Sequence, residues 1–237
     1  MLQDLKNTLK SKESIVLLYT AFALVCIHFI GDIRKIQITD FRMWMAEGVS
    51  AEFKQLAWWT SINLVFYLIL PILIVHFVFK EHLLNYGFKF SKYGSNKIYL
   101  LFFVGMVPLV FLASKTAGFQ LKYPFYHLNI GEKLWPWFVF WEILYFFQFL
   151  GLEFFFRGFM VLGLKEKMGM QSILIMTVPY CMVHFTKPMP EAVASIFAGL
   201  ALGYLSYKKG SIIPGAILHF GVALTMDLMS LWQKGLL

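Results

Sequence analysis

Seven long apolar runs constrain this chain more than any other feature of its sequence. They lie at residues 15–30, 57–79, 98–114, 134–164, 170–186, 191–207 and 211–233. Only 14% of the residues are charged and 59% are hydrophobic, whereas a soluble domain carries about 25% charged residues. A helix needs about 20 apolar residues to cross a bilayer, so we expect an all-α polytopic transmembrane helical bundle of about 7–8 spans. No second domain is visible, and the bundle is expected to form a single membrane domain over residues 1–237.

Two segments depart from a plain span. Residues 134–164 would form about 46 Å of helix, against a hydrocarbon core about 30 Å thick. This run is therefore either one tilted helix that overshoots the bilayer or two pieces broken near Gly151. Residues 33–56 place Met43, Trp44 and Met45 among charges, which is typical of a segment that lies at the membrane interface.

The net charge of +8 comes from basic residues scattered between the apolar runs. Lys and Arg beside spans set membrane topology, so this charge predicts a lipid bilayer as partner and no nucleic acid. Cys26 and Cys181 lie in apolar runs without CxxC spacing, which indicates neither a disulfide framework nor a sulfur metal site. We expect a multi-pass integral membrane protein of the bacterial inner (cytoplasmic) membrane.

Eight ionisable residues lie inside the apolar runs, where charge is costly and often marks function. They are His28, His76, Glu142, Glu153, Arg157, His184, His219 and Asp227. The first two histidines stand alone, and we expect each to be neutral and hydrogen-bonded to a neighbouring helix.

Glu153 and Arg157 are spaced i, i+4, so their side chains share one helix face and can form a pair. The arginine would keep the glutamate ionised in apolar surroundings. This pair either locks two helices together or belongs to an active site. Glu142 lies three helical turns earlier and shares the same face only if the helix is unbroken.

Two further groups follow on later runs. His184 comes after Pro179 near the end of its run, where water can reach it. Glu191 follows two prolines and is expected at the start of the next helix, where a carboxylate is favourable. His219 and Asp227 lie about two helical turns apart, so Asp227 can orient the histidine only through water or another side chain.

One carboxylate and two histidines on three helices form an acid–base set. The carboxylate can accept a proton from water, and a histidine can donate one to a leaving amine. The same trio, Glu153, His184 and His219, is also able to ligate zinc. The chain contains no HExxH, GxSxG, GxGxxG or Walker-type motif.

In this order, and on spans of a polytopic chain, the three blocks resemble the CPBP (Abi) family. This family contains type II CAAX prenyl endopeptidases and bacteriocin-processing or self-immunity proteins, and its pattern is EExxxRG, FxxxH, then HxxxN or HxxxB. Residues 140–233 carry the resemblance. Glu153 to Gly158 match ExxxRG, His184 matches the second block and His219 matches the third.

Three positions depart from the family pattern. Leu152 stands in place of the first glutamate, which is usually assigned as the base that activates water. Tyr180 replaces the phenylalanine, and Ala223 replaces the asparagine. Either the chain is no longer a protease, or another carboxylate serves as base, namely Glu142, Glu153 or Asp227.

The resemblance implies an intramembrane peptide-bond hydrolase that acts on a hydrophobic or membrane-embedded peptide or protein. Glu153, together with His184, would activate water, and His219 would stabilise the oxyanion. Supporting residues would be Arg157, Glu142, Glu191 and Asp227. The resemblance implies either no required cofactor or a zinc ion held by Glu153, His184 and His219.

Two other functions are compatible with the same residues. A catalytically impaired member would be a membrane scaffold or bacteriocin-immunity protein that keeps the fold and binds a hydrophobic peptide. Buried carboxylates and histidines also relay protons in transporters, although the sequence shows no inverted repeat that would support a transporter. A cleavage product, tight binding without turnover, or proton-coupled flux would each identify one of the three.

Overall fold

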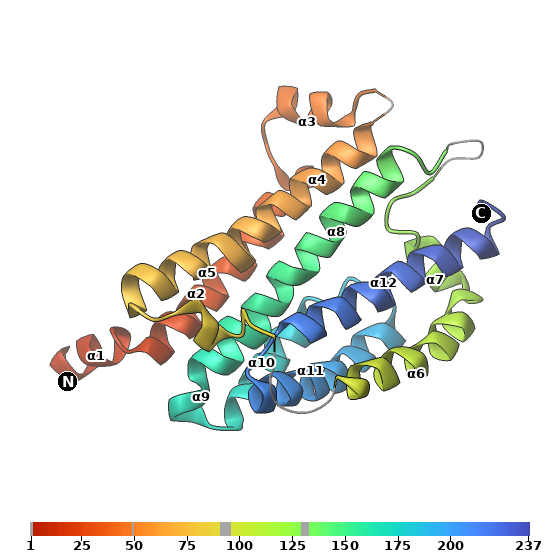
Figure 1. Cartoon of the computed structure of the whole chain (residues 1–237). Helices are drawn as coiled ribbons and strands as arrows, with labels where there is room; N and C mark the ends of the chain where they lie inside the picture. Colours follow the sequence, from red (N-terminus) through yellow and green to blue (C-terminus); the bar gives the residue numbers. More distant parts are fainter. Residues whose placement is uncertain (1, 49, 91–95, 129–132) are drawn as a thin grey trace.

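The computed structural model describes residues 2–48, 50–90, 96–128 and 133–237 (Figure 1). Within these ranges the chain forms helices and no strands, which confirms the predicted all-α fold. The α-helices are α1 (Leu2–Leu9), α2 (Lys12–Cys26), α3 (Thr39–Ala46), α4 (Ala51–Leu64), α5 (Leu70–Leu73), α6 (Lys97–Ser114), α7 (Ala117–Lys122), α8 (Trp137–Glu153), α9 (Gly163–Met168), α10 (Gln171–Met182), α11 (Met189–Lys209) and α12 (Ile213–Gln233). Four π-helical segments, η1 (Ile27–Gly31), η3 (Val65–Ile69), η4 (Ile74–Phe79) and η6 (Phe154–Leu162), extend them, with short 3₁₀ turns η2 (Ile33–Lys35) and η5 (Leu83–Tyr86).

Six helical segments in the described ranges are long and apolar enough to cross a membrane. They are Lys12–Gly31, Ala51–Phe79, Lys97–Ser114, Trp137–Met168, Met189–Lys209 and Ile213–Gln233. The remaining predicted run, 170–186, forms only the 12-residue helix α10. At 1.5 Å per residue α10 is about 18 Å long, which is too short to cross about 30 Å of hydrocarbon. The described residues therefore contain six candidate spans and one short apolar helix, roughly consistent with the seven or eight spans that the sequence predicted.

The long run at 134–164 is one continuous helical segment. It passes from α8 through the π-helical segment η6 into α9 without a break. Gly151 does not interrupt it, because its missing side chain lets α4 approach: a Cβ there would lie 3.3 Å from Leu64 Cδ2. Of the two sequence interpretations, the single helix is correct.

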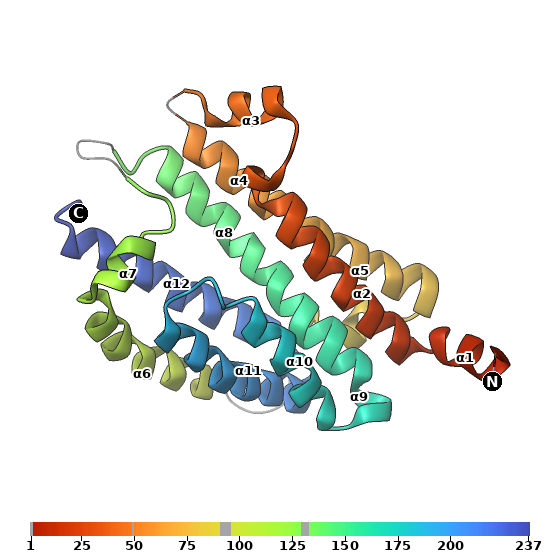
Figure 2. The same cartoon turned by 180° about the vertical axis from the view of Figure 1, so that it is seen from behind.

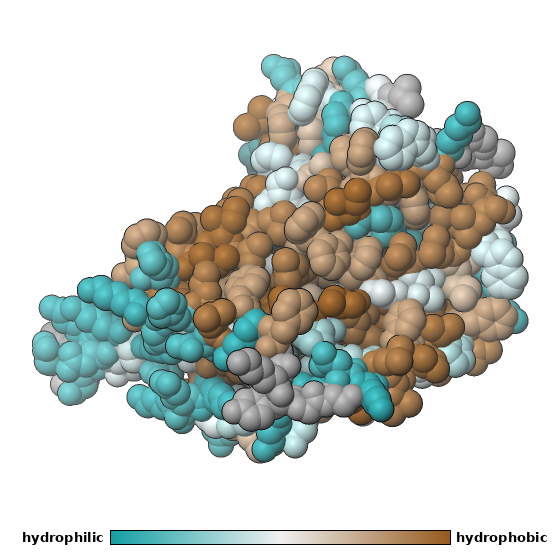
Figure 3. Space-filling model, in the orientation of Figure 1, coloured by the Kyte–Doolittle hydropathy of each residue, from teal (hydrophilic) through white to brown (hydrophobic). Residues whose placement is uncertain are grey.

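The α8 helix is the axis of the bundle. It packs against α4 on one side and α12 on the other, while α10 and α11 pack against η6 (Figures 1 and 2). In Figure 3 hydrophobic side chains form a broad band across the middle of the molecule, and hydrophilic ones gather at the end that carries α1. This distribution is that of an integral membrane protein.

The interfacial segment contains α3, which lies across one end of the bundle (Figure 1). Met43 and Trp44 are exposed there, as a segment at the membrane interface requires, whereas Met45 is buried. The two isolated histidines lie on the bundle surface instead of bonding to a neighbouring span. His28 Nε2 lies 2.6 Å from Lys35 Nζ in η2, and His76 stacks edge-on against Phe77.

Gly158 in η6 marks the closest helix packing in the core. A Cβ at this position would lie 2.5 Å from the backbone carbonyl oxygen of Tyr86 and 2.9 Å from Phe154 Cδ2. Because one neighbour is main chain, it cannot move aside as a flexible side chain would. The η5 turn therefore docks on η6 only where residue 158 has no side chain.

We predict that Gly158→Ala lowers the melting temperature of the purified protein in detergent. Overpacking a close-fitted core costs about 1–3 kcal/mol. Gly105 in α6 is the matched control, because a Cβ there would meet nothing within 4 Å. Gly105→Ala should leave the melting temperature unchanged or raise it, since alanine favours helix over glycine. Equal melting temperatures for the two variants would contradict this account of the packing.

Candidate active site

Glu153, the last residue of α8, is the centre of a buried charged cluster. Its side chain is 0% exposed, as is that of Arg157. The Oε1 atom of Glu153 lies 2.9 Å from His219 Nδ1 on α12 and 3.2 Å from Arg157 Nη1. The i, i+4 spacing thus produces the buried pair expected from the sequence, and a histidine from a distant helix joins it.

Two local features bring α12 to Glu153. The helix begins with Pro214 in its first turn, where a proline is well tolerated. Gly215 follows, and a Cβ at that position would lie only 3.0 Å from Glu153 Oε2. The missing side chain makes room for the carboxylate, and His219 follows one helical turn later on the same face.

Tyr180 on α10 connects the charged cluster to the second histidine. The guanidinium carbon of Arg157 lies 4.0 Å from the centre of the Tyr180 ring, a cation–π contact. The same ring lies 4.8 Å from the His184 ring and 6.2 Å from the His219 ring, centre to centre. In the sequence this tyrosine was only a departure from FxxxH, because no spacing rule places an aromatic ring between two histidines on other elements.

His184 lies in the turn between α10 and α11, outside the six spans. Its Nδ1 atom is 2.8 Å from the carbonyl oxygen of Tyr180. Burial lowers the pKa of His184 to about 4, and the nearby charges of His219, Lys187 and Arg157 act in the same direction. The imidazole is therefore neutral at neutral pH.

The hydrogen bonds define what each histidine can do. A carboxylate and a carbonyl only accept hydrogen bonds, so Nδ1 of both His219 and His184 carries the hydrogen and donates it. A ring that is neutral and donates through Nδ1 has Nε2 as its proton acceptor. For His219 the buried carboxylate also stabilises the charged ring that forms when Nε2 takes up a proton.

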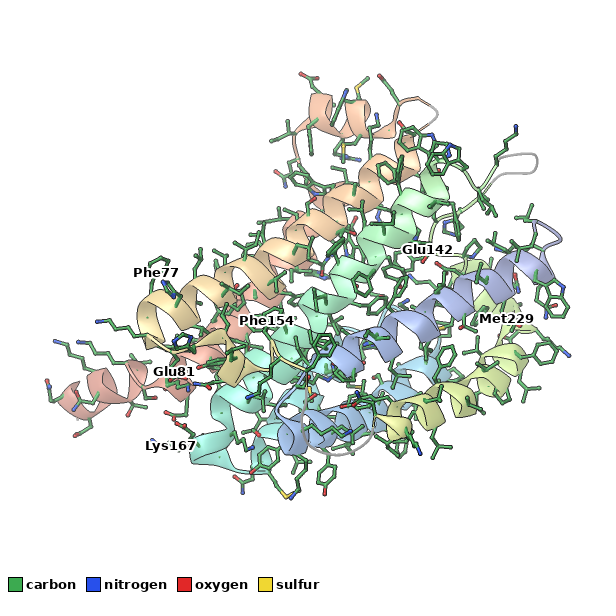
Figure 4. The ribbon with its side chains drawn as sticks, in the orientation of Figure 1. Phe77, Glu81, Glu142, Phe154, Lys167 and Met229 are labelled. Carbon is green, nitrogen blue, oxygen red and sulfur yellow. The ribbon has the colours of Figure 1, made fainter. Side chains whose placement is uncertain are left out.

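Three residues expected to support the site lie elsewhere in the bundle. Glu142 is 11 residues before Glu153 on the same continuous helix, a rise of about 16 Å. In Figure 4 Glu142 lies well away along α8 from Phe154, the residue that follows Glu153. It faces Asp227 of α12 instead. The Asp227 Oδ1 atom accepts a hydrogen bond from the backbone N–H of Phe125 at 2.8 Å, and Glu191 accepts one from the Tyr123 hydroxyl at 2.8 Å.

Among the described residues, the three predicted zinc ligands, Glu153, His184 and His219, do not form a preformed metal-binding group. Within the described ranges, no three His, Cys, Asp or Glu side chains come together as a metal-binding group. Glu153 and His219 already satisfy each other through Oε1 and Nδ1, and Arg157 occupies the remaining side of that oxygen.

Residues 134–225 match the family model for type II CAAX prenyl endopeptidase Rce1-like proteins. This segment is similar to the Rce1-like family over 92 of the 237 residues of the chain. The match confirms the CPBP resemblance and contains Glu153, Arg157, His184 and His219 but not Asp227. The Rce1-like family is a family of proteases. Comparisons of the chain with curated proteins and with solved structures gave no match.

We predict that Arg157→Leu destabilises the protein by about 3–5 kcal/mol, because it leaves the Glu153 carboxylate buried without its partner. Thermal unfolding in detergent would measure the loss. Arg34→Leu is the matched control, since Arg34 pairs with Asp32 at 2.8 Å but is 83% exposed, and it should change little.

A Glu153→Gln background provides a second control for the same pair. In that background Arg157→Leu should lower the free energy of unfolding by less than it does in the wild type, because no Glu153 carboxylate is left without a partner. Equal costs in the two backgrounds would mean that Arg157 stabilises the fold through packing alone.

Proposed function

We propose that this protein is an intramembrane endopeptidase in which His219, oriented by Glu153, activates water for peptide-bond hydrolysis. The observation that carries the proposal is the hydrogen bond from His219 Nδ1 to the fully buried Glu153 carboxylate, inside the segment that is similar to the Rce1-like family. The His219 side chain is 18% exposed and Glu153 is 0% exposed. A water molecule or substrate therefore reaches the histidine more readily than the carboxylate.

In the proposed reaction His219 Nε2 takes a proton from water while the water oxygen attacks the carbonyl carbon of the scissile bond. Glu153 stabilises the resulting imidazolium through Nδ1. When the tetrahedral intermediate collapses, the C–N bond breaks and the imidazolium returns the proton to the leaving amine. This assignment exchanges the roles expected from the sequence, in which Glu153 was the base and His219 held the oxyanion.

Two features support His184 and Arg157 in accompanying roles. The His184 and His219 rings both lie beside the Tyr180 ring, and we propose that they contact the same substrate group. Arg157 compensates the Glu153 charge through a 3.2 Å contact.

The proposed substrate is a hydrophobic or membrane-embedded peptide or protein, since the cluster lies within an apolar bundle. The proposed location is the bacterial inner membrane, which the family resemblance implies. No step of the reaction requires nucleic acid or a metal ion.

A second candidate function is peptide binding without turnover. Leu152 stands where the family pattern has its first glutamate and is buried in the main apolar cluster with Phe155 and Tyr67. Ala223 stands where the pattern has asparagine and packs in a separate cluster. A scaffold or immunity protein would tolerate both apolar residues, since neither is needed to hold a peptide.

We predict that the purified protein in liposomes cleaves apolar peptides and that His219→Ala and Glu153→Gln each reduce the rate by about 10²–10⁴-fold. Mass spectrometry of the products would measure cleavage, and a chelator should leave the rate unchanged. His76→Ala is the matched control, because this histidine lies on the exposed surface of a span. Saturable peptide binding without any product would favour the scaffold function over the endopeptidase.

A further inference from the structure

Residues 123–128 form a strap that lies between the end of α7 and the start of α8. The strap has no regular secondary structure, yet Tyr123 and Tyr126 are each 1% exposed. It crosses the bundle at the end where α8 begins and α12 finishes (Figure 1). A loop buried in this way must have its backbone polar groups satisfied by the elements around it.

The α12 helix satisfies the strap's main chain in both directions. Asp227 Oδ1 accepts a hydrogen bond from the Phe125 N–H at 2.8 Å. The Ser230 hydroxyl donates to the Tyr123 carbonyl oxygen, and Lys234 Nζ donates to the same oxygen at 2.6 Å. Asp227, Ser230 and Lys234 therefore provide one acceptor and two donors that hydrogen-bond the main-chain N–H and C=O groups of the strap.

The Phe125 side chain fills a pocket made of aromatic rings. Its ring centre lies 5.5 Å from that of Trp59 on α4, 5.6 Å from Trp141 and 5.5 Å from Tyr145, both on α8. The Phe125 and Trp141 rings are stacked at 12°. This pocket fits one aromatic side chain, and it lies beside the main-chain contact of Asp227.

Beside the strap, Trp141 and Glu142 both face the Asp227 carboxyl group, and four polar atoms there have only these neighbours. They are Trp141 Nε1, both carboxylate oxygens of Glu142, and Asp227 Oδ2. Asp227 is 0% exposed and Glu142 is 8% exposed, and their carboxyl groups face each other. The three carboxylate oxygens are acceptors that a ligand with further N–H donors can hydrogen-bond, whereas the Trp141 N–H is a donor.

The cleft is connected to the candidate active site by two routes. Asp227 is eight residues after His219 on α12, about 12 Å, which is the length of three to four residues of extended chain. Lys187, three residues after His184, donates to the Tyr123 hydroxyl at 2.7 Å and lies 4.8 Å from the Phe125 ring centre. A peptide in place of the strap would therefore reach both histidines.

We infer that the cleft formed by Trp59, Trp141, Tyr145 and Asp227 binds an aromatic residue of the substrate peptide, and that the strap is an internal occupant which the substrate displaces. The inference rests on the proposed function for the cleavage of the bound peptide, but the binding event itself needs no cleavage. Asp227 is then a positioning residue that holds the substrate's main-chain N–H.

A labelled peptide with the strap's own sequence, LKYPFYHL (121–128), tests the inference on the full chain in detergent. The wild type should bind it weakly, because the strap competes. Phe125→Ala weakens the internal occupant and should bind the peptide about tenfold more tightly, since affinity depends on the fraction of open cleft. Phe159→Ala is the matched control, a fully buried phenylalanine of η6 that packs against Tyr19 and Phe79 instead of the strap, and it should bind as the wild type does.

Variants of Asp227 distinguish a binding cleft from a fold that Phe125→Ala has only loosened. In the Phe125→Ala background, Asp227→Leu should weaken peptide binding about tenfold, because the main-chain acceptor is lost. Asp227→Asn keeps an acceptor oxygen and should weaken it less. Equal affinity of Phe125→Ala and Phe159→Ala, or no effect of Asp227→Leu, would overturn the inference.

Hydrogen exchange in the wild type gives a measurement that needs no variant. Peptide binding should accelerate exchange of the strap amides, that of Phe125 above all, whereas most ligands protect the amides they touch. Unchanged or slower exchange over residues 123–128 at saturating peptide would overturn the inference. A His219→Ala protein that binds the peptide normally but cleaves nothing would support both proposals, and binding without cleavage by the wild type would overturn only the endopeptidase.

Discussion

Two opposite charges, Glu153 and Arg157, lie fully buried in an apolar helical bundle, and much of the surrounding structure keeps them compensated. Burying one such charge alone costs several kcal/mol. The cost is met by one ion-pair contact, one hydrogen bond from His219 and the face of the Tyr180 ring. Each partner comes from a different helix, so the pair also fixes how η6, α10 and α12 meet. A glycine on α12 is needed for that approach, because any side chain at 215 would press on the carboxylate.

Hydropathy and spacing predict much of this fold. The apolar runs predict the helical bundle, because exclusion from water depends only on composition along the chain. The i, i+4 spacing predicts the Glu153–Arg157 contact, because helix geometry fixes it locally. Run length alone could not show that residues 170–186 turn back after a 12-residue helix, since a run that enters and reverses is as apolar as one that crosses. The sequence also could not show that Glu142 faces Asp227, because the two residues lie on different helices.

Tertiary packing decides which residues meet in the candidate site. The hydrogen bond between His219 and Glu153 joins residues 66 positions apart, and that between Phe125 and Asp227 joins residues 102 positions apart. No sequence spacing encodes which ring nitrogen faces the carboxylate. That detail nevertheless decides the chemistry: with Nδ1 turned to Glu153, only Nε2 can meet water. The strap could not be predicted from the sequence for a related reason. Its residues form no motif, and their burial depends on the helices that pack around them.

The strap also explains how a polar cleft can persist in an apolar bundle. Opening it without a ligand would remove the Phe125 N–H from Asp227 Oδ1, and leaving a buried acceptor without its donor costs about 1–3 kcal/mol. A peptide can supply a main-chain N–H to Asp227 and an aromatic ring to the Trp59, Trp141 and Tyr145 pocket. It thereby replaces the contacts that are lost when the strap leaves the cleft. The net cost of exchange is then small for an extended peptide of this kind. For a lipid or a peptide without a free N–H at that position, the lost hydrogen bond is not restored, so the cleft selects its occupant before any bond is broken.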